Sequence, residues 1–367
     1  MKKTLVALAV AAVAATSANA AVVYNQDGTK VEVAGSFRVL LSKNTGERAD
    51  LKNAGSRVII KGTQDLGDGY SALANLEIRF DANDKKSFGD IEAKRVYAGF
   101  AKEGVGTLTF GKQLTNLDDV ALSDYTYDLG GVKQTQTSGD KVAKFRSADF
   151  AGFSFGLDYL FGENDKDKYN HKSGFGVSAF YTTPEFAADT KLNFEAGFSQ
   201  LKYGSYGVAE VAATPGNVGV AKVDPYDYKV NAFVVGSELV SGPFSIGVDY
   251  AQKKATDDKN VIDSSTRSYG GKIFNKVREI EVGLKYNYLE NASIYGEYIN
   301  GKASKDNGKA VKMNAYVLGT DYWFTKSVVT YLEAGTYRFK GFKDIDSNAT
   351  DDKAHDNKIG VGFRVYF

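Results

Sequence analysis

The sequence predicts an all-β fold, a closed antiparallel barrel of sixteen strands that spans a membrane. Three observations predict this fold: apolar and polar residues alternate with a period of two, Tyr and Phe number 23 each against 4 Pro, and Gly numbers 39. Such alternation is typical of strands with one apolar face. Aromatic residues favour strands and membrane interfaces, and glycine suits crowded or sharply bent positions of a sheet.

The first element is an export signal and not part of the barrel. Residues 1–20 combine Lys2 and Lys3 with an apolar run and a final Ala-Asn-Ala. This order is that of a secretory signal peptide, and the run is shorter than the ~20 residues of a membrane-spanning helix. The alternative is a buried helix of the fold. We expect cleavage after Ala20 and a mature chain of residues 21–367.

The composition argues against several classes of protein. An exported chain without Cys cannot be a compact disulfide scaffold. The 46 Lys and Arg nearly balance the 45 Asp and Glu, so no basic excess suggests nucleic acid binding. His171 and His355 lie in charged loops without a catalytic constellation, and residues 344–348 lack the Gly and Glu of a calcium loop. We expect no catalysis, no cofactor and no bound metal.

The strands follow one another along the rest of the chain. The alternation is clearest within residues 31–41, 76–80, 153–161, 192–198, 244–250 and 282–288. Short turns are expected at 65–69, 102–106, 147–152, 183–189, 239–243, 289–292 and 324–327. Longer polar stretches lie near 43–55, 82–90, 112–140, 162–173, 200–226, 252–275, 300–312 and 340–357. Short turns at one end and long loops at the other are typical of an outer-membrane barrel.

The last nine residues, IGVGFRVYF, predict how the barrel closes. The odd positions from Ile359 to Phe367 are apolar, whereas the even positions hold two glycines, Arg364 and a tyrosine. Because an unpaired strand edge cannot face hydrocarbon, the last strand must pair with the first. We expect Phe363, Val365 and Phe367 to face lipid at this closure and Arg364 to face the inside.

A secreted soluble β-sandwich is the alternative fold, because its strands would alternate in the same way. Two features count against it. The polar faces of the strands carry many charges, among them Arg38, Glu77 and Lys285. In addition, paired short and long connections are not expected of a sandwich.

Five stretches have an informative order and spacing over residues 21–367: AVVYNQDGTKVEVAGSFRV, SRVIIKGTQDLGDGYSALANLEIRF, KRVYAGFAKEGVGTLTFGKQ, GFSFGLDYLFG and GVGFRVYF. They resemble the general porins of Gram-negative outer membranes, closest to those of Haemophilus and Pasteurella relatives. The resemblance implies a homotrimeric channel for ions and small hydrophilic solutes, exported through the general secretory pathway. It also implies contacts with outer-membrane lipid, lipopolysaccharide and the barrel assembly machinery, with no nucleic acid partner.

In the family this sequence resembles, the third long loop folds inward and narrows the channel, which makes residues 114–140 the corresponding segment here. Asp124 and Asp128 flank a Tyr-Thr-Tyr stretch that precedes Leu-Gly-Gly, and this resembles the family's acidic tip. Asp118 and Asp119 are weaker candidates. The alternative is an exposed acidic loop without a role.

The resemblance also implies basic residues on the barrel wall opposite this loop. Arg38, Arg57 and Arg95 all fall on the polar face of a strand, and an arginine on the lipid face would cost ~2–4 kcal/mol at the midplane. Arg57 and Arg95 match the family's basic positions. Arg38 stands two residues beyond the usual lysine, where this chain has Ser36.

Further charges extend this predicted wall. Lys141 and Arg146 resemble its continuation on the strand after the loop, although their spacing differs from the family's. Glu77 and Arg79 are expected to support the arginines. The alternative is a set of solvated charges held by local salt bridges. A substrate-selective channel and an adhesin that acts through its outer loops remain alternative functions of the same barrel.

Overall fold

The computed structural model describes residues 20–80, 88–132, 134–163, 171–204, 226–259, 261–263, 269–347 and 349–367. The predicted signal peptide therefore lies outside the described residues, apart from Ala20. No helix in these ranges is long and apolar enough to cross a membrane. The helices of the described chain are the 3-10 helix η1 (Asn116–Asp119) and α2 (Phe342–Ile345).

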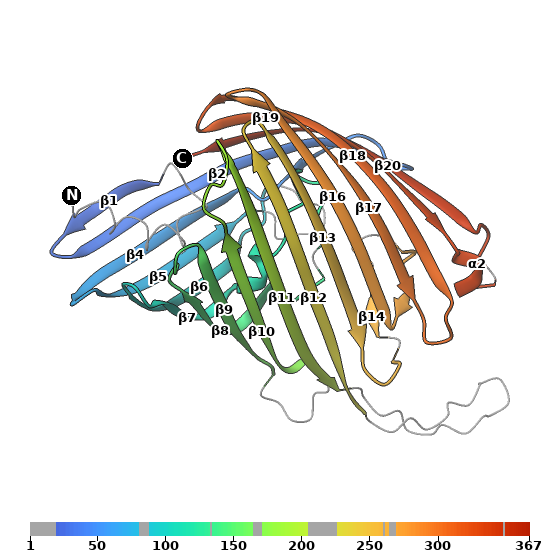
Figure 1. The fold of residues 1–367 in the computed structure, drawn as a ribbon, viewed down its shortest axis with the longest axis horizontal. Coiled ribbons are helices and arrows are strands. Elements are labelled where there is room, and N and C mark those ends of the chain that lie inside the picture. Colours follow the sequence, from blue (N-terminus) through green and yellow to red (C-terminus); the bar gives the residue numbers. More distant parts are fainter. Residues whose placement is uncertain are drawn as a thin grey trace.

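Within the described ranges, the main sheet is 18-stranded and curls on itself, as Figure 1 shows. The predicted barrel is confirmed, because sixteen of these strands pair antiparallel in a closed ring. In order, they are β2 (Thr29–Asn44), β4 (Arg57–Gly67), β5 (Tyr70–Arg79), β6 (Glu92–Lys102), β7 (Gly106–Leu114), β8 (Ser138–Ser147), β9 (Phe153–Phe161), β10 (His171–Thr182), β11 (Thr190–Gly204), β12 (Asp227–Ser241), β13 (Phe244–Ala255), β16 (Lys276–Leu289), β17 (Ala292–Ser304), β18 (Ala310–Thr325), β19 (Val328–Lys340) and β20 (Lys353–Tyr366).

Two short strands, β1 (Ala21–Gln26) and β3 (Asp50–Asn53), complete the pairing along β2. The predicted pairing of the last strand with the first is confirmed, because β20 pairs with the second half of β2 while β1 pairs with its beginning. Where β20 ends, the Gly35 N–H donates to the Phe367 carbonyl over 2.7 Å. The start of the described chain at β1 and the C-terminal end of β20 lie on the same side of the barrel (Figure 1).

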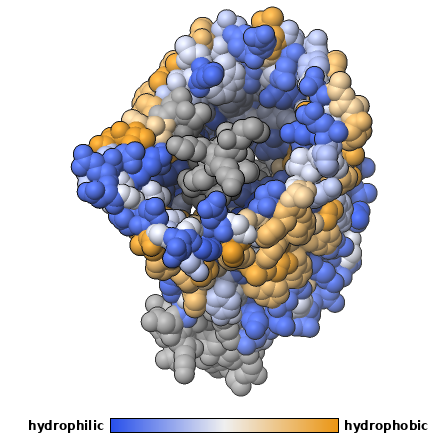
Figure 2. Space-filling model, turned by 60° about the vertical axis from the view of Figure 1, so that its left-hand side comes forward, coloured by the Kyte–Doolittle hydropathy of each residue, from blue (hydrophilic) through white to orange (hydrophobic). Residues whose placement is uncertain are grey.

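Exposed and buried positions alternate along β20 as its sequence predicts. The side chains of Ile359, Val361 and Phe363 are 50%, 48% and 41% exposed, whereas Gly360 and Gly362 are buried. Figure 2 shows hydrophobic residues on the outer side of the barrel and hydrophilic residues around an opening. An apolar outside matches a lipid-facing surface.

The inside is not polar throughout, contrary to the expectation from alternation. Near the long-loop ends of β16–β19, buried apolar side chains face inward: Val277, Ile299, Ala303, Val311, Met313 and Phe339. They pack against a hairpin of β14 (Ile262–Asp263) and β15 (Ile273–Phe274), against Tyr269 and against α2. The described parts of the connection between β13 and β16 thus cover this part of the wall and make it an apolar core.

Candidate functional site: a loop bound to one wall and facing another

Residues 115–132 and 134–137, the described part of the connection from β7 to β8, lie against the inner wall. Its first turn forms η1, and its hydrogen-bond partners on the wall lie on strands from β8 to β20. These partners occupy the faces opposite the exposed apolar side chains, so the segment lies inside the ring. We call residues 115–132 and 134–137 the inner loop.

Six carboxylates on the wall, five of them buried, accept hydrogen bonds from the backbone of the inner loop. Asp249 on β13 accepts the N–H groups of Leu122 and Ser123 over 2.8 and 2.7 Å. Glu297 on β17 accepts the N–H of Tyr125 over 2.6 Å. Charge-assisted bonds of this kind are stronger than neutral ones. We call the six residues that act in this way the anchor carboxylates: Asp158, Glu195, Asp249, Glu281, Glu297 and Glu333.

Two glycines let the loop backbone approach the wall this closely. A Cβ atom at Gly247 on β13 or at Gly283 on β16 would collide with the backbone of Leu122 or Ser123. Sequence reasoning placed these glycines on the polar faces of their strands but gave them no role. Their signal was the inward position itself, since glycine in a strand often marks a close backbone approach.

The two tyrosines of the loop tip pack and do not form an open aromatic track. The hydroxyls of Tyr125 and Tyr127 donate to Glu238 and Asp321, each over 2.8 Å. Burial first, and these carboxylates second, raise the pKa of both hydroxyls, so both stay protonated donors. The Tyr127 ring also stacks on Tyr331 with 4.2 Å between the ring centroids.

Four arginines gather on β2, β4, β5 and β6, on the wall away from the anchor carboxylates. Glu77 on β5 is 1% exposed and binds three of them: Arg57 at 3.2 Å, Arg79 at 2.7 Å and Arg95 at 2.8 Å. These three arginine side chains are 13–18% exposed. One carboxylate therefore holds three guanidinium groups, which leaves the cluster with a net positive charge.

Arg38 and Arg364 extend this cluster toward β20. Arg38 Nε donates to the Ser36 hydroxyl over 2.8 Å, so the residue at the family's usual lysine position supports the arginine here. Arg364 Nη2 donates to the Tyr127 carbonyl over 3.0 Å, and its guanidinium lies 4.7 Å from the centre of the Tyr127 ring. Sequence reasoning placed Arg364 on the inner face but did not include it in the site. We call Arg38, Arg57, Arg79, Arg95 and Arg364 the arginine wall.

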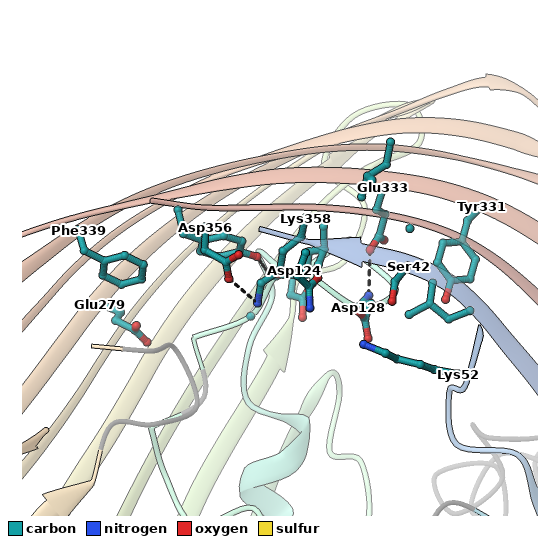
Figure 3. Close-up of a pocket in the computed structure, with 18 of the residues that line it drawn as sticks. Ser42, Lys52, Asp124, Asp128, Glu279, Tyr331, Glu333, Phe339, Asp356 and Lys358 are labelled. Carbon is teal, nitrogen blue, oxygen red and sulfur yellow. Dashed lines mark hydrogen bonds and ion pairs between the residues drawn. The ribbon is translucent and has the colours of Figure 1, made fainter. Parts of the chain in front are cut away.

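The acidic tip of the inner loop is free to face the channel. Asp124 and Asp128 are exposed, because the anchor carboxylates bind the backbone of the loop and not these side chains. Asp124 accepts the N–H of Thr126 over 3.0 Å. Both aspartates line a cavity of about 550 Å³ between the loop and strands β2, β19 and β20, together with Lys52 and Lys358 (Figure 3).

The remaining predicted residues separate into two groups. Arg146 on β8 lies 3.5 Å from Asp119 of η1, and its guanidinium lies 3.5 Å from the centre of the Phe180 ring. Asp118 lies beside Asp119 in the same helix. Lys141 instead is exposed and donates to the Gly162 carbonyl over 2.7 Å. Its odd spacing from Arg146 places it on the other face of β8.

Comparisons with known proteins agree with this architecture. The family model for Gram-negative porins matches residues 7–341. A major outer membrane protein of Pasteurella multocida strain Pm70 is 46% identical over 378 residues, which cover all of both chains, and another from that species is 43% identical over 386.

Solved structures support the fold alone. OmpT of Vibrio cholerae, folded in vitro, has a TM-score of 0.69 at 19% identity and covers 94% of this chain and 99% of its own. Salmonella typhi OmpF, in complex with daunomycin, has a TM-score of 0.65 at 17% identity, with the same coverage. By its sequence relatives and its family match, the chain belongs to the Gram-negative porin family and is a general diffusion channel of the outer membrane, not an enzyme.

Proposed function

We propose that the narrowest part of the channel lies between the inner loop and the arginine wall, and that these two surfaces set its selectivity. The observation that carries the proposal is the orientation of the loop. Its backbone is bound to buried carboxylates on one side, while Asp124 and Asp128 remain exposed on the other. Opposite charges therefore border the space through which a solute passes.

The field across this space acts on the solute more than on the fold. Two unit charges about 8 Å apart interact by roughly 0.5 kcal/mol in water and roughly 2 kcal/mol at an effective dielectric constant of 20. Energies of this size are comparable with thermal energy for a passing ion. Polar solutes that align with the field pass, whereas apolar solutes are disfavoured because they would displace ordered water. Arginine keeps its charge at physiological pH, so the wall does not titrate.

Recordings of single channels in planar bilayers test the proposal. Arg57→Ala removes one positive charge and shifts the reversal potential toward cations, whereas Asp124→Asn shifts it toward anions, each by roughly twofold in the permeability ratio. Arg278→Ala is a matched control, because Arg278 is exposed on the outer face of β16. Unchanged conductance and selectivity in both lumen variants would remove these residues from the constriction while leaving the fold intact.

We further propose that residues 1–20 are cleaved on export and that the mature chain forms a homotrimer. Support comes from the sequence pattern of a signal peptide and from a trimer form of Vibrio cholerae OmpT among the similar structures. Membrane insertion would involve the barrel assembly machinery, lipid and lipopolysaccharide, with Phe363, Val365 and Phe367 at the closing strand. Conductance steps that appear in threes would support the trimer, and single independent steps would contradict it.

A further inference from the structure

We infer that Glu279 is a positioning residue that couples the outer connection between β13 and β16 to the inner loop. This inference rests on the proposed role of the inner loop as the constriction. Glu279 lies on β16 and is 1% exposed. Its Oε1 accepts the Tyr269 hydroxyl over 3.0 Å, and its Oε2 accepts Nε2 of Gln134 over 2.7 Å. The two oxygens of one carboxylate thus bind two different loops.

In the connection between β13 and β16, packing holds the Tyr269 side chain in place. Tyr269 is 1% exposed, and its ring packs edge-to-face with Phe274 and with Phe339 of β19, with 6.3 and 5.8 Å between the ring centroids. A Cβ atom at Gly301 of β17 would collide with the Tyr269 hydroxyl, so that position must stay small. The hydroxyl is therefore fixed in place by the apolar core and points at Glu279.

On the side of the inner loop, Gln134 belongs to the half that returns to β8, and the described residues of this half form few other hydrogen bonds to the wall. Gly131 donates to Glu281 over 2.9 Å, and Gln136 donates to the Ser199 hydroxyl over 3.3 Å. Gln134 lies between these two points. Its neighbour Thr135 is 6% exposed, and the Thr135 hydroxyl has no hydrogen-bond partner among the described residues. The position of this half of the loop therefore depends strongly on the bond between Gln134 and Glu279.

An exchange of the two side chains separates this coupling from a general loss of structure. Gln134→Glu sets a second carboxylate against Glu279, and the two repel. In the double variant Gln134→Glu/Glu279→Gln, the new amide at position 279 donates to the new carboxylate at 134 and still accepts the Tyr269 hydroxyl. Tyr269→Phe removes only the outer bond. Gln200→Glu is the matched charge control, because Gln200 bonds to Asn231 on the outer face of β11.

Single-channel recordings then report how firmly the loop is held. Because a hydrogen bond to a charged group is worth about a factor of ten in an equilibrium, Gln134→Glu and Tyr269→Phe each raise the fraction of time in closed substates roughly tenfold. The exchange variant and Gln200→Glu behave like the parent chain. The inference would be overturned if the exchange variant spent as much time in closed substates as Gln134→Glu does. It would also be overturned if Tyr269→Phe spent no more time in them than the parent chain.

A measurement without any current distinguishes failure of this coupling from failure of the proposed constriction. The chain contains no Cys, so Thr135→Cys introduces a single thiol in the inner loop with little loss of bonding. In the parent background this buried thiol reacts slowly with a water-soluble maleimide, and Tyr269→Phe accelerates the reaction roughly tenfold. Equal rates in the two backgrounds would contradict the coupling whatever the selectivity of the channel.

Discussion

The two sides of the inner wall both carry charge, but they use it differently. On β4, β5 and β6, three partly exposed arginines surround Glu77 on the inner face of the barrel. On β9–β19, five of the six anchor carboxylates are buried, with Asp249 and Glu281 0% exposed beneath the inner loop. Under the proposed function, inward charges act on the solute on one side of the barrel, whereas on the other side they hold the chain.

The physical reason for this difference is the course of one loop. Where the chain leaves a strand, its backbone N–H groups no longer have partners in the sheet and need other acceptors. Buried backbone N–H groups are almost always paired. Acidic side chains on the wall supply these acceptors, and the loop in turn covers the acids. The arginines keep access to the channel because the loop binds the other side.

The largest expected effect comes from removing one of the anchor carboxylates. Asp249→Ala removes the acceptor of two backbone N–H groups and of the Ser123 hydroxyl. We expect the free energy of unfolding to fall by about 3 kcal/mol, and the loop to leave the wall so that conductance changes and becomes unstable. Urea unfolding in lipid vesicles and single-channel recording measure the two effects.

The control for this anchor is Asp140→Ala. Asp140 is 80% exposed and lies 3.5 Å from Lys112 at the rim, so its loss should change stability by less than about 0.5 kcal/mol. Equal losses for Asp249→Ala and Asp140→Ala would show that the wall acids do not hold the loop.

A smaller effect compares one neutralised carboxylate on each side. Glu77→Gln frees three arginines from their shared partner, so we expect a roughly twofold shift of the permeability ratio toward anions. Glu281→Gln changes the same charge beneath the loop and should shift the ratio less. Reversal potentials in a salt gradient measure both variants. A larger shift for Glu281→Gln would mean that the solute path runs along the anchored side.

The smallest effect separates Arg146 from Lys141, two of the three basic residues of β8. Arg146→Ala removes a side chain that is 24% exposed and contacts Asp119, and we expect a selectivity shift of less than twofold. Lys141→Ala alters a side chain that bonds to a loop carbonyl on the other face, so reversal potential and conductance should stay unchanged. An effect of Lys141→Ala equal to that of Arg146→Ala would place both residues on the channel.

The sequence predicted well which side chains face inward on each strand, but it did not predict the hydrogen-bond partners of those side chains. The alternation of odd and even positions along each strand placed Arg57, Arg95 and Arg364 on the inner face, because a charge is costly in hydrocarbon. The same alternation also placed Asp158, Glu195 and Asp249 inside, but it gave no sign that these carboxylates would bind loop backbone. The partner of Asp249 lies 127 residues away along the chain, and no local pattern encodes such a contact.

The sequence by itself determined the number of strands, their faces and the closure of β20 on β2, because the side-chain period of two and the cost of an open edge in lipid act locally. Only the tertiary structure decided which inward charged side chains stay exposed to water and which are covered by other parts of the chain. That outcome depends on where the inner loop and the outer connection around Tyr269 fold, and their positions follow from packing and hydrogen bonds between distant segments.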